Sequence, residues 1–295
     1  MKKNKIVVFG GSGFIGSHVA DHLSEAGYKV FIYDIRKSSY LRDDQKMIVG
    51  DILDQENVDE AVKDAKAVYN FAALADLDKV INQPVETINI NLLGTVKILE
   101  ACRKNSVDRF IYASTVYVYS REGGFYRCSK QAAEEYIKEF YNRYGQDYCV
   151  LRYGSLYGPR SGPENGLIRL LTTAINKGKL QYMGHPDAFR EYVHIDDAAK
   201  ASLLAMGKEF KNEHIVITGQ EPMKVSSVLK MIGEILDIKK DLEFLDQDYS
   251  GHYVNTPYSY NKQIGMKYIP SMHIDLGQGI LQMIDEINKL DGISK

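Results

Sequence analysis

The fold of this chain follows from Gly10-Gly11-Ser12-Gly13-Phe14-Ile15-Gly16, a stretch with three glycines in the spacing G-x-x-G-x-x-G. The apolar run Ile6–Phe9 before it predicts a buried strand, and Ile15–Ala26 after it has the apolar period of a helix. Glycines at such a turn let the backbone approach a pyrophosphate, which sits on the free N–H groups of the helix N-terminus. The residues expected to form this cofactor-binding turn are Gly10, Gly13, Phe14, Ile15 and Gly16.

A carboxylate closes the next predicted strand, Val30–Asp34, 18 residues beyond Gly16. Asp34 stands where the acid of a dinucleotide site accepts hydrogen bonds from the ribose hydroxyls of adenosine. Its charge would repel a 2′-phosphate and so favours NAD over NADP, although Arg36 could in principle hold that phosphate. The order of strand, glycine turn, helix and acid predicts dinucleotide binding.

Short apolar runs and helical patterns alternate through the first half of the chain. The further predicted strands, rich in Val, Ile, Phe and Tyr, are Met47–Val49, Ala67–Ala73, Phe110–Ser114 and Tyr148–Arg152. The further predicted helices are Asn57–Asp64, Val85–Lys104 and Tyr126–Tyr144. This alternation predicts an α/β fold, a doubly wound parallel sheet of the Rossmann type.

The pattern is looser in the second half. It predicts a strand over His214–Thr218 and helices over Leu167–Asn176, Ser226–Leu236 and Leu276–Ile287. We therefore expect an NAD-binding Rossmann domain over residues 1–155, with later segments interleaved into it. Residues 156–295 are expected to form mainly a smaller substrate-binding lobe.

Composition limits the classes of function. The chain has 295 residues, 44% of them hydrophobic, and a formal charge of −2, so no basic field suggests nucleic acid. Its three cysteines have no ligand spacing, which argues against a zinc site or a disulfide framework. No stretch approaches the roughly 20 apolar residues of a membrane span, and no signal peptide is recognisable. We expect a soluble, cytoplasmic protein with no metal, no membrane partner and no nucleic acid partner.

Tyr126 and Lys130 are the candidate reactive pair. They lie four residues apart in a predicted helix, so both project from one face. An ammonium beside a phenol, together with a positively charged nicotinamide ring, lowers the phenol pKa and makes it a usable base. Thr115, at the end of the preceding strand, could hydrogen-bond the same substrate oxygen. Tyr-x-x-x-Lys alone is also the pattern of an accidental helical pair, because the chain has 21 tyrosines.

A series of ordered motifs covers nearly the whole chain. Besides the glycine turn, they are Gly50-Asp51-Ile52, Asn70-Phe71-Ala72-Ala73, Ser114-Thr115-Val116-Tyr117-Val118-Tyr119, Tyr126-Arg127-Cys128-Ser129-Lys130, Leu151-Arg152-Tyr153-Gly154, Tyr157-Gly158-Pro159-Arg160 and Arg190-Glu191-Tyr192-Val193-His194. With them the sequence resembles the extended short-chain dehydrogenase/reductases, specifically the nucleotide-sugar epimerase/dehydratase family.

The resemblance implies a role for each matching residue. The catalytic positions fall on Thr115, Tyr126 and Lys130. Further cofactor positions fall on Asp51 and Ile52 against the adenine, and on Phe71, Ala72, Ala73, Asn91, Tyr126, Lys130 and Tyr153. Substrate positions fall on Thr115, Ser155, Arg190 and His252, with Arg190 pairing with the diphosphate. For Asn91 an amide that only packs helices remains an alternative, and for His252 an exposed loop residue does.

Departures from the family narrow the chemistry. Its dehydratases carry an acid and a base directly after the catalytic Ser/Thr, where this chain has Val116 and Tyr117. The segment Ser120–Phe125 is also shorter than the usual loop beside the sugar pocket. The resemblance then implies NAD-dependent oxidation of a ring hydroxyl, C4, of a nucleotide-diphosphate sugar by a 4-epimerase, with a net 4-dehydrogenase as the alternative. A non-catalytic NAD-binding regulator is the alternative of another class, and a homodimer is expected.

Overall fold

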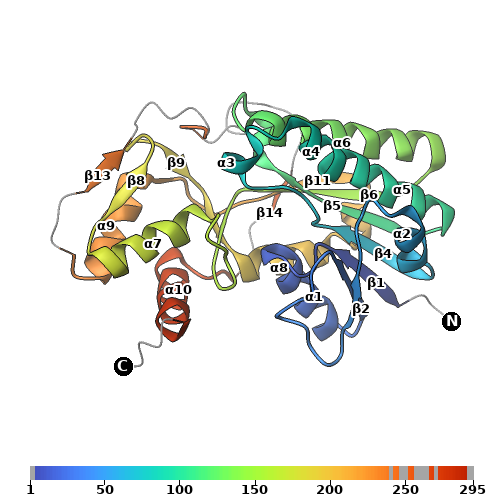
Figure 1. Ribbon diagram of the computed structural model, residues 1–295, viewed down its shortest axis with the longest axis horizontal. Coiled ribbons are helices and arrows are strands. Elements are labelled where there is room, and N and C mark those ends of the chain that lie inside the picture. Colours follow the sequence, from blue (N-terminus) through green and yellow to red (C-terminus); the bar gives the residue numbers. More distant parts are fainter. Residues whose placement is uncertain (1–3, 239–241, 246–251, 256–265, 269–271, 291–295) are drawn as a thin grey trace.

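The main sheet has eight strands, all parallel. The computed structural model describes residues 4–238, 242–245, 252–255, 266–268 and 272–290, and its sheet has the order β14-β11-β6-β5-β4-β1-β2-β3 (Figure 1). The strands are β1 (Lys5–Phe9), β2 (Lys29–Asp34), β3 (Lys46–Val49), β4 (Ala65–Asn70), β5 (Arg109–Thr115), β6 (Tyr148–Tyr153), β11 (Glu213–Ile217) and β14 (Met266–Tyr268). The order reverses between β1 and β4, and ligands of such sheets bind at the carboxyl ends beside that switch point.

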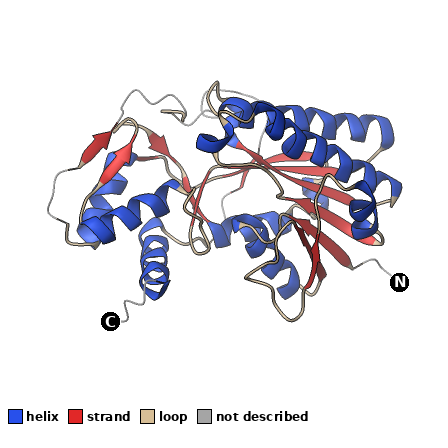
Figure 2. Ribbon diagram, in the orientation of Figure 1, coloured by secondary structure: helices blue, strands red, loops and turns tan. Residues whose placement is uncertain are grey.

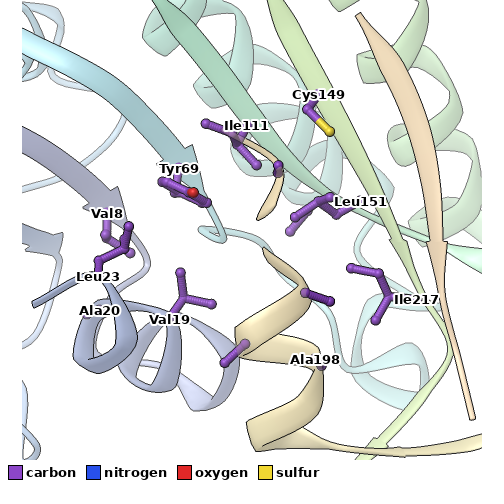
Figure 3. Packing of buried hydrophobic residues seen from close by; sticks show 14 of the residues in the cluster. Val8, Val19, Ala20, Leu23, Tyr69, Ile111, Cys149, Leu151, Ala198 and Ile217 are labelled. Atoms are coloured by element: carbon purple, nitrogen blue, oxygen red, sulfur yellow. The ribbon is translucent and has the colours of Figure 1, made fainter. Parts of the chain in front are cut away.

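Helices cover both faces of the sheet. One face carries α1 (Phe14–Glu25) and α8 (Ile195–Leu204), and the other carries α2 (Gln55–Val62), α5 (Gly94–Lys104) and α6 (Gly124–Tyr144) (Figures 1 and 2). Apolar side chains of the strands pack against those of α1 and α8, among them Val8, Val19, Leu23, Leu151 and Ala198 (Figure 3). This three-layer arrangement confirms the predicted Rossmann fold.

The predicted helix Val85–Lys104 is three consecutive segments. They are α4 (Pro84–Thr87), the π-helical η1 (Ile88–Leu93) and α5. Within η1 the side chain of Asn91 is fully buried, and its backbone oxygen accepts a hydrogen bond from Thr95 Oγ1 at 2.7 Å. Single-turn π segments interrupt α-helices most often at functional positions. The apolar period could not reveal this one, because it continues on both sides.

A second hydrophobic core lies beside the sheet. It is enclosed by α7 (Gly166–Lys177), α9 (Val225–Ile235) and α10 (Leu276–Leu290), with Leu171, Leu229 and Ile280 fully buried among them. Three small sheets complete this part: β7 (Ser155–Tyr157) with β10 (Tyr192–His194), β8 (Gln181–Met183) with β13 (Glu243–Leu245), and β9 (Phe189–Arg190) with β12 (Met223–Lys224). The chain crosses between the two cores several times, because α8, β11 and β14 return to the main sheet (Figure 1).

Shorter elements and one full helix escaped the sequence patterns. The short helices are α3 (Leu77–Val80), η2 (Val116–Tyr119) and η3 (Lys208–Phe210). The short strands, which were not predicted either, are β7, β8, β9, β10, β12, β13 and β14. Helix α8 was missed because its buried face consists mostly of alanine and serine, which give little apolar contrast. In the part of the chain that the structure describes, no helix is long and apolar enough to cross a membrane.

Candidate active site

The glycine turn between β1 and α1 packs closely against backbone atoms, both its own and those of the segment after β4. Gly10 has a φ of +72°, and a Cβ built there would lie 2.5 Å from the nitrogen of Ala72. A Cβ at Gly16 would lie 2.3 Å from the carbonyl oxygen of Gly10, and Gly13 N donates to that oxygen at 3.1 Å. Only glycine fits positions 10 and 16, because any side chain there would displace the turn.

The first turn of α1 leaves its backbone N–H groups open to an anion. Gly13 is the N-cap, it offers no side-chain cap, and the first turn holds no acidic residue. Phe14 and Ile15 therefore begin a helix whose positive end has no partner from its own turn. The segment is suited to the pyrophosphate of a dinucleotide.

Asp34 fixes the shape of the turn. Its Oδ2 accepts a hydrogen bond from Ser12 N at 3.0 Å and its Oδ1 one from Arg36 N at 3.2 Å, while Arg36 itself is exposed. The carboxylate thus lies beside the glycine turn at the end of β2, the position of the ribose-binding acid in dinucleotide-binding folds. These residues fit NAD, whose positive redox ring supplies the hydride acceptor when it is bound.

Two further predicted cofactor segments lie beside this turn or one strand away. Phe71, Ala72 and Ala73 follow β4, and Phe71 stacks on Tyr69 with ring centroids 6.1 Å apart. Asp51 is exposed after β3 and Ile52 is 5% exposed in the core beneath α5. The role of Asp51 and Ile52 against adenine stays a prediction.

The structure brings Thr115, Tyr126 and Lys130 together at the carboxyl end of β5. Thr115 lies near enough to Tyr126 to affect the pKa of its phenol, and Lys130 Nζ lies 5.7 Å from the centre of the Tyr126 ring. Lys130 is 2% exposed, and its Nζ donates to the carbonyl oxygen of Ala113 at 2.7 Å. Burial raises the pKa of Tyr126 to about 12, an effect that Thr115 opposes. Burial also lowers the pKa of Lys130 to about 7, so its charge at neutral pH depends on its neighbours.

Asn91 lies behind this group. Its Nδ2 donates to Ser129 Oγ at 3.0 Å and to the carbonyl oxygen of Leu74 at 3.0 Å, and its Oδ1 accepts from Leu74 N at 2.7 Å. The amide therefore ties the loop after β4 to α6. These bonds favour the packing alternative, in which Asn91 supports the cofactor segment from below.

Tyr153, at the end of β6, faces α8. Its hydroxyl is 2.6 Å from Ser202 Oγ, and its ring centroid is 6.5 Å from that of Phe71. Burial raises the pKa of Tyr153, so this phenol stays protonated. The contact with Phe71 places Tyr153 beside the predicted cofactor segment.

Ser155, Arg190 and His252 gather around Tyr253. The guanidinium of Arg190 lies 4.7 Å from the centre of the Tyr253 ring and donates to the Tyr253 carbonyl oxygen at 2.7 Å. Ser155 lies near the Tyr253 side chain and opposes the rise that burial causes in the pKa of Tyr253. His252 Nδ1 bonds the hydroxyl of Tyr117, and burial lowers the pKa of His252 to about 4. His252 is thus neutral at pH 7 and half-buried rather than an exposed loop residue.

Val116 and Tyr117, which stand where dehydratases carry an acid and a base, have different surroundings. Val116 is 1% exposed in an apolar cluster with Tyr119, Val216 and Tyr253, so it offers no group for proton transfer. Tyr117 faces His252, and burial holds the pKa of its phenol well above the usual range. Neither position supplies a carboxyl group.

Several residues of this site were not anticipated from the sequence. They are Ala113, Ser129, Glu134, Tyr253 and the arginine Arg152. A signal existed for two of them: Arg152 is a charge within a buried strand, and Glu134 lies one helical turn from Lys130. Ala113 contributes a backbone oxygen, Ser129 a small side chain, and Tyr253 a ring and a backbone oxygen from a loop, and no pattern singles these residues out.

Comparisons with known proteins agree with this arrangement. Residues 6–218 match the model of the NAD dependent epimerase/dehydratase family. The chain is 30% identical over 302 residues to a Methanocaldococcus jannaschii protein named "Putative UDP-glucose 4-epimerase", covering 95% of this chain and 97% of that protein. It is 28% identical to UDP-N-acetyl-alpha-D-glucosaminuronate decarboxylase of Bacillus cytotoxicus, covering 79% and 80%. The crystal structure of UDP-glucose 4-epimerase from Thermotoga maritima, with UDP-glucose, superposes with a TM-score of 0.82 at 27% identity, covering 97% and 99%.

Proposed function

Because the chain belongs to the NAD-dependent epimerase/dehydratase family, we propose that it is a sugar-nucleotide 4-epimerase. Its substrate is a nucleotide-diphosphate sugar, whose C4 hydroxyl is oxidised and then restored in the opposite configuration. The observation that carries this proposal is the group of Tyr126, Thr115 and Lys130 at the end of β5, combined with the absence of a carboxyl group at Val116 and Tyr117.

Tyr126 is the proposed base for the sugar hydroxyl. Its phenol is a weak base while its pKa is near 12, so it needs a nearby positive charge to ionise. Lys130 supplies that charge from the same helix face, and its ammonium is held by Ala113 rather than by solvent. We propose that Thr115, which lies beside Tyr126, holds the same sugar oxygen.

Arg190 and its neighbours are the proposed substrate contacts. Arg190 is 8% exposed, and its guanidinium already binds the carbonyl oxygens of Phe189 and Tyr253. A planar guanidinium held in this way can pair with a diphosphate without losing much side-chain freedom. Ser155 and His252 lie around Tyr253, so we propose that they contact the sugar or its phosphates.

The mass of the product distinguishes a 4-epimerase from a net 4-dehydrogenase, a dehydratase and a binding protein. The enzyme is to be incubated with UDP-, GDP-, CDP- and dTDP-sugars, with heat-inactivated enzyme as the control, and the products separated and weighed by mass spectrometry. We expect a product of unchanged mass and altered C4 configuration. A released ketone, two hydrogens lighter, would show a net 4-dehydrogenase instead. A product lighter by one water would contradict the interpretation of Val116 and Tyr117, and no turnover of any sugar would favour a binding protein.

We also propose a homodimer formed through α4, η1 and α6. These segments pack against one another and expose large apolar side chains, with Val85 69%, Ile88 54% and Tyr136 49% exposed. Such side chains on neighbouring helices form a patch typical of an interface. Sedimentation at micromolar concentration should give twice the monomer mass, and Ile88→Glu should halve it. Leu281→Glu on α10 is the matched control, and a monomeric parent protein would refute the dimer.

A further inference from the structure

A buried ion pair lies one helical turn beyond Lys130. Arg152 Nη2 is 2.6 Å from Glu134 Oε2, and Arg152 Nε is 3.1 Å from Glu134 Oε1. The side chains of Glu134 and Arg152 are 4% and 9% exposed. Two parallel contacts make this a bidentate pair, which fixes the carboxylate in both position and orientation.

The pair is connected to the segments that carry the reactive groups. Ser114 Oγ donates to Glu134 Oε1 at 2.5 Å, and Ser114 directly precedes Thr115 in β5. Arg152 Nη1 donates to the hydroxyl of Tyr119 at 2.5 Å, at the end of the turn η2 that follows Thr115. One network therefore joins α6, β5, β6 and η2 below the active site.

Glu134 provides negative charge close to Lys130. The two residues are four apart in α6, so they share a face, and the Glu134 charge raises the Lys130 pKa against the larger lowering effect of burial. The other groups that face Lys130 are the ring of Tyr112, at 4.7 Å from Nζ, and the ring of Tyr126. Neither phenol is charged at neutral pH, because burial raises both pKa values.

Other titratable groups around Glu134 do not replace Arg152 as its partner. His214 Nε2, on β11, is 3.8 Å from Glu134 Oε2, but burial lowers the pKa of His214 to about 4. His214 is therefore neutral at pH 7. Tyr119 is a phenol whose pKa burial raises, so it is neutral as well.

We propose that Glu134, held by Arg152, is a positioning residue that keeps Lys130 charged beside Tyr126. Its significance for catalysis rests on the proposed function, whereas its action on Lys130 does not. Without the carboxylate, the contacts of the Lys130 ammonium among the described residues would be the Ala113 carbonyl oxygen and two aromatic rings. Burial would then favour the neutral amine, and Tyr126 would lose the cation that makes it a base.

The test is a titration of Lys130 by NMR. Protein labelled with ¹³C-lysine is saturated with NAD, without sugar, and the Lys130 signal is identified by its loss in Lys130→Met. In Glu134→Gln we expect the midpoint of the Lys130 titration to fall by about one pH unit, the usual effect of losing an opposite charge at short range. In Glu134→Asp, which keeps the carboxylate, the midpoint of the Lys130 titration should stay close to that of the parent protein. Glu135→Gln removes the same charge from the exposed neighbour and should leave the midpoint unchanged.

A second variant covers the case in which Glu134→Gln does not fold, since it leaves Arg152 buried without its carboxylate. Glu134→Gln/Arg152→Gln removes the carboxylate together with the guanidinium that opposes it, so it should still lower the midpoint, but by less than Glu134→Gln does. An unchanged midpoint in whichever of these variants folds would overturn the proposal.

A rate measurement links the titration to catalysis. If the pKa of Lys130 falls by one unit from about 7, the fraction of Lys130 that is charged at pH 7 falls to about a fifth of its former value. The sugar-dependent rate of Glu134→Gln should therefore fall about fivefold. The rate should recover towards pH 6, because Lys130 regains its proton there. A rate loss of the same size at every pH, with an unchanged midpoint, would show a merely structural role. A shifted midpoint in an enzyme that turns over no sugar nucleotide would overturn the proposed function alone.

Discussion

Replacing Tyr126 by Phe is expected to lower the rate of sugar oxidation by about 10²- to 10⁴-fold, the usual effect of losing a general base. The substitution removes only the phenol hydroxyl and keeps the ring beside Lys130 Nζ. The fold and the affinity for NAD should therefore change little. The rate is to be measured with the sugar nucleotide identified by product analysis, and NAD binding by calorimetry.

A second tyrosine of the same helix provides the control. Tyr144 is 51% exposed at the far end of α6, so Tyr144→Phe also removes one phenol hydroxyl but leaves the active site intact. It should turn over as the parent enzyme does. A rate of Tyr126→Phe close to that of Tyr144→Phe would show that Tyr126 is not the base.

Gly16→Ala should weaken NAD binding by about 100-fold or more, the size of effect expected when a binding backbone is displaced by about 1 Å. The new Cβ would lie 2.3 Å from the Gly10 oxygen and 2.9 Å from the Gly11 Cα, which are backbone atoms of the phosphate-binding turn. The turn must move, and the N–H groups of α1 then no longer match the pyrophosphate. Calorimetric titration with NAD measures the loss.

Gly166→Ala is the matched control for this change. Like Gly16 in α1, Gly166 lies in the first turn of its helix, α7. Nothing lies within 4 Å of a Cβ built at Gly166. It should bind NAD as the parent protein does. Equal affinities in Gly16→Ala and Gly166→Ala would mean that the glycine turn does not hold the cofactor.

The sequence alone was enough to predict the glycine turn and every described strand of the main sheet except β14. Strand and helix patterns repeat over short distances, so each predicted segment from Ile6–Phe9 to Leu276–Ile287 overlaps a strand or helix of the structure. The glycines at positions 10, 13 and 16 were equally informative, because a tight turn between a strand and a helix is a local requirement. Tyr126 and Lys130 were found for the same reason: one helix places both.

Only the tertiary structure showed which distant groups meet. The Tyr117 hydroxyl bonds His252, 135 residues later in the chain, and no periodicity links the two. Glu134 pairs with Arg152 because β6 lies beside β5 and beneath α6, so the pair depends on the order of strands in the sheet. The charge of Lys130 depends on burial and on that same pair, and burial results from packing rather than from spacing along the chain. The sequence thus identified the candidate catalytic residues, and packing decided the ionisation and the partners of their side chains.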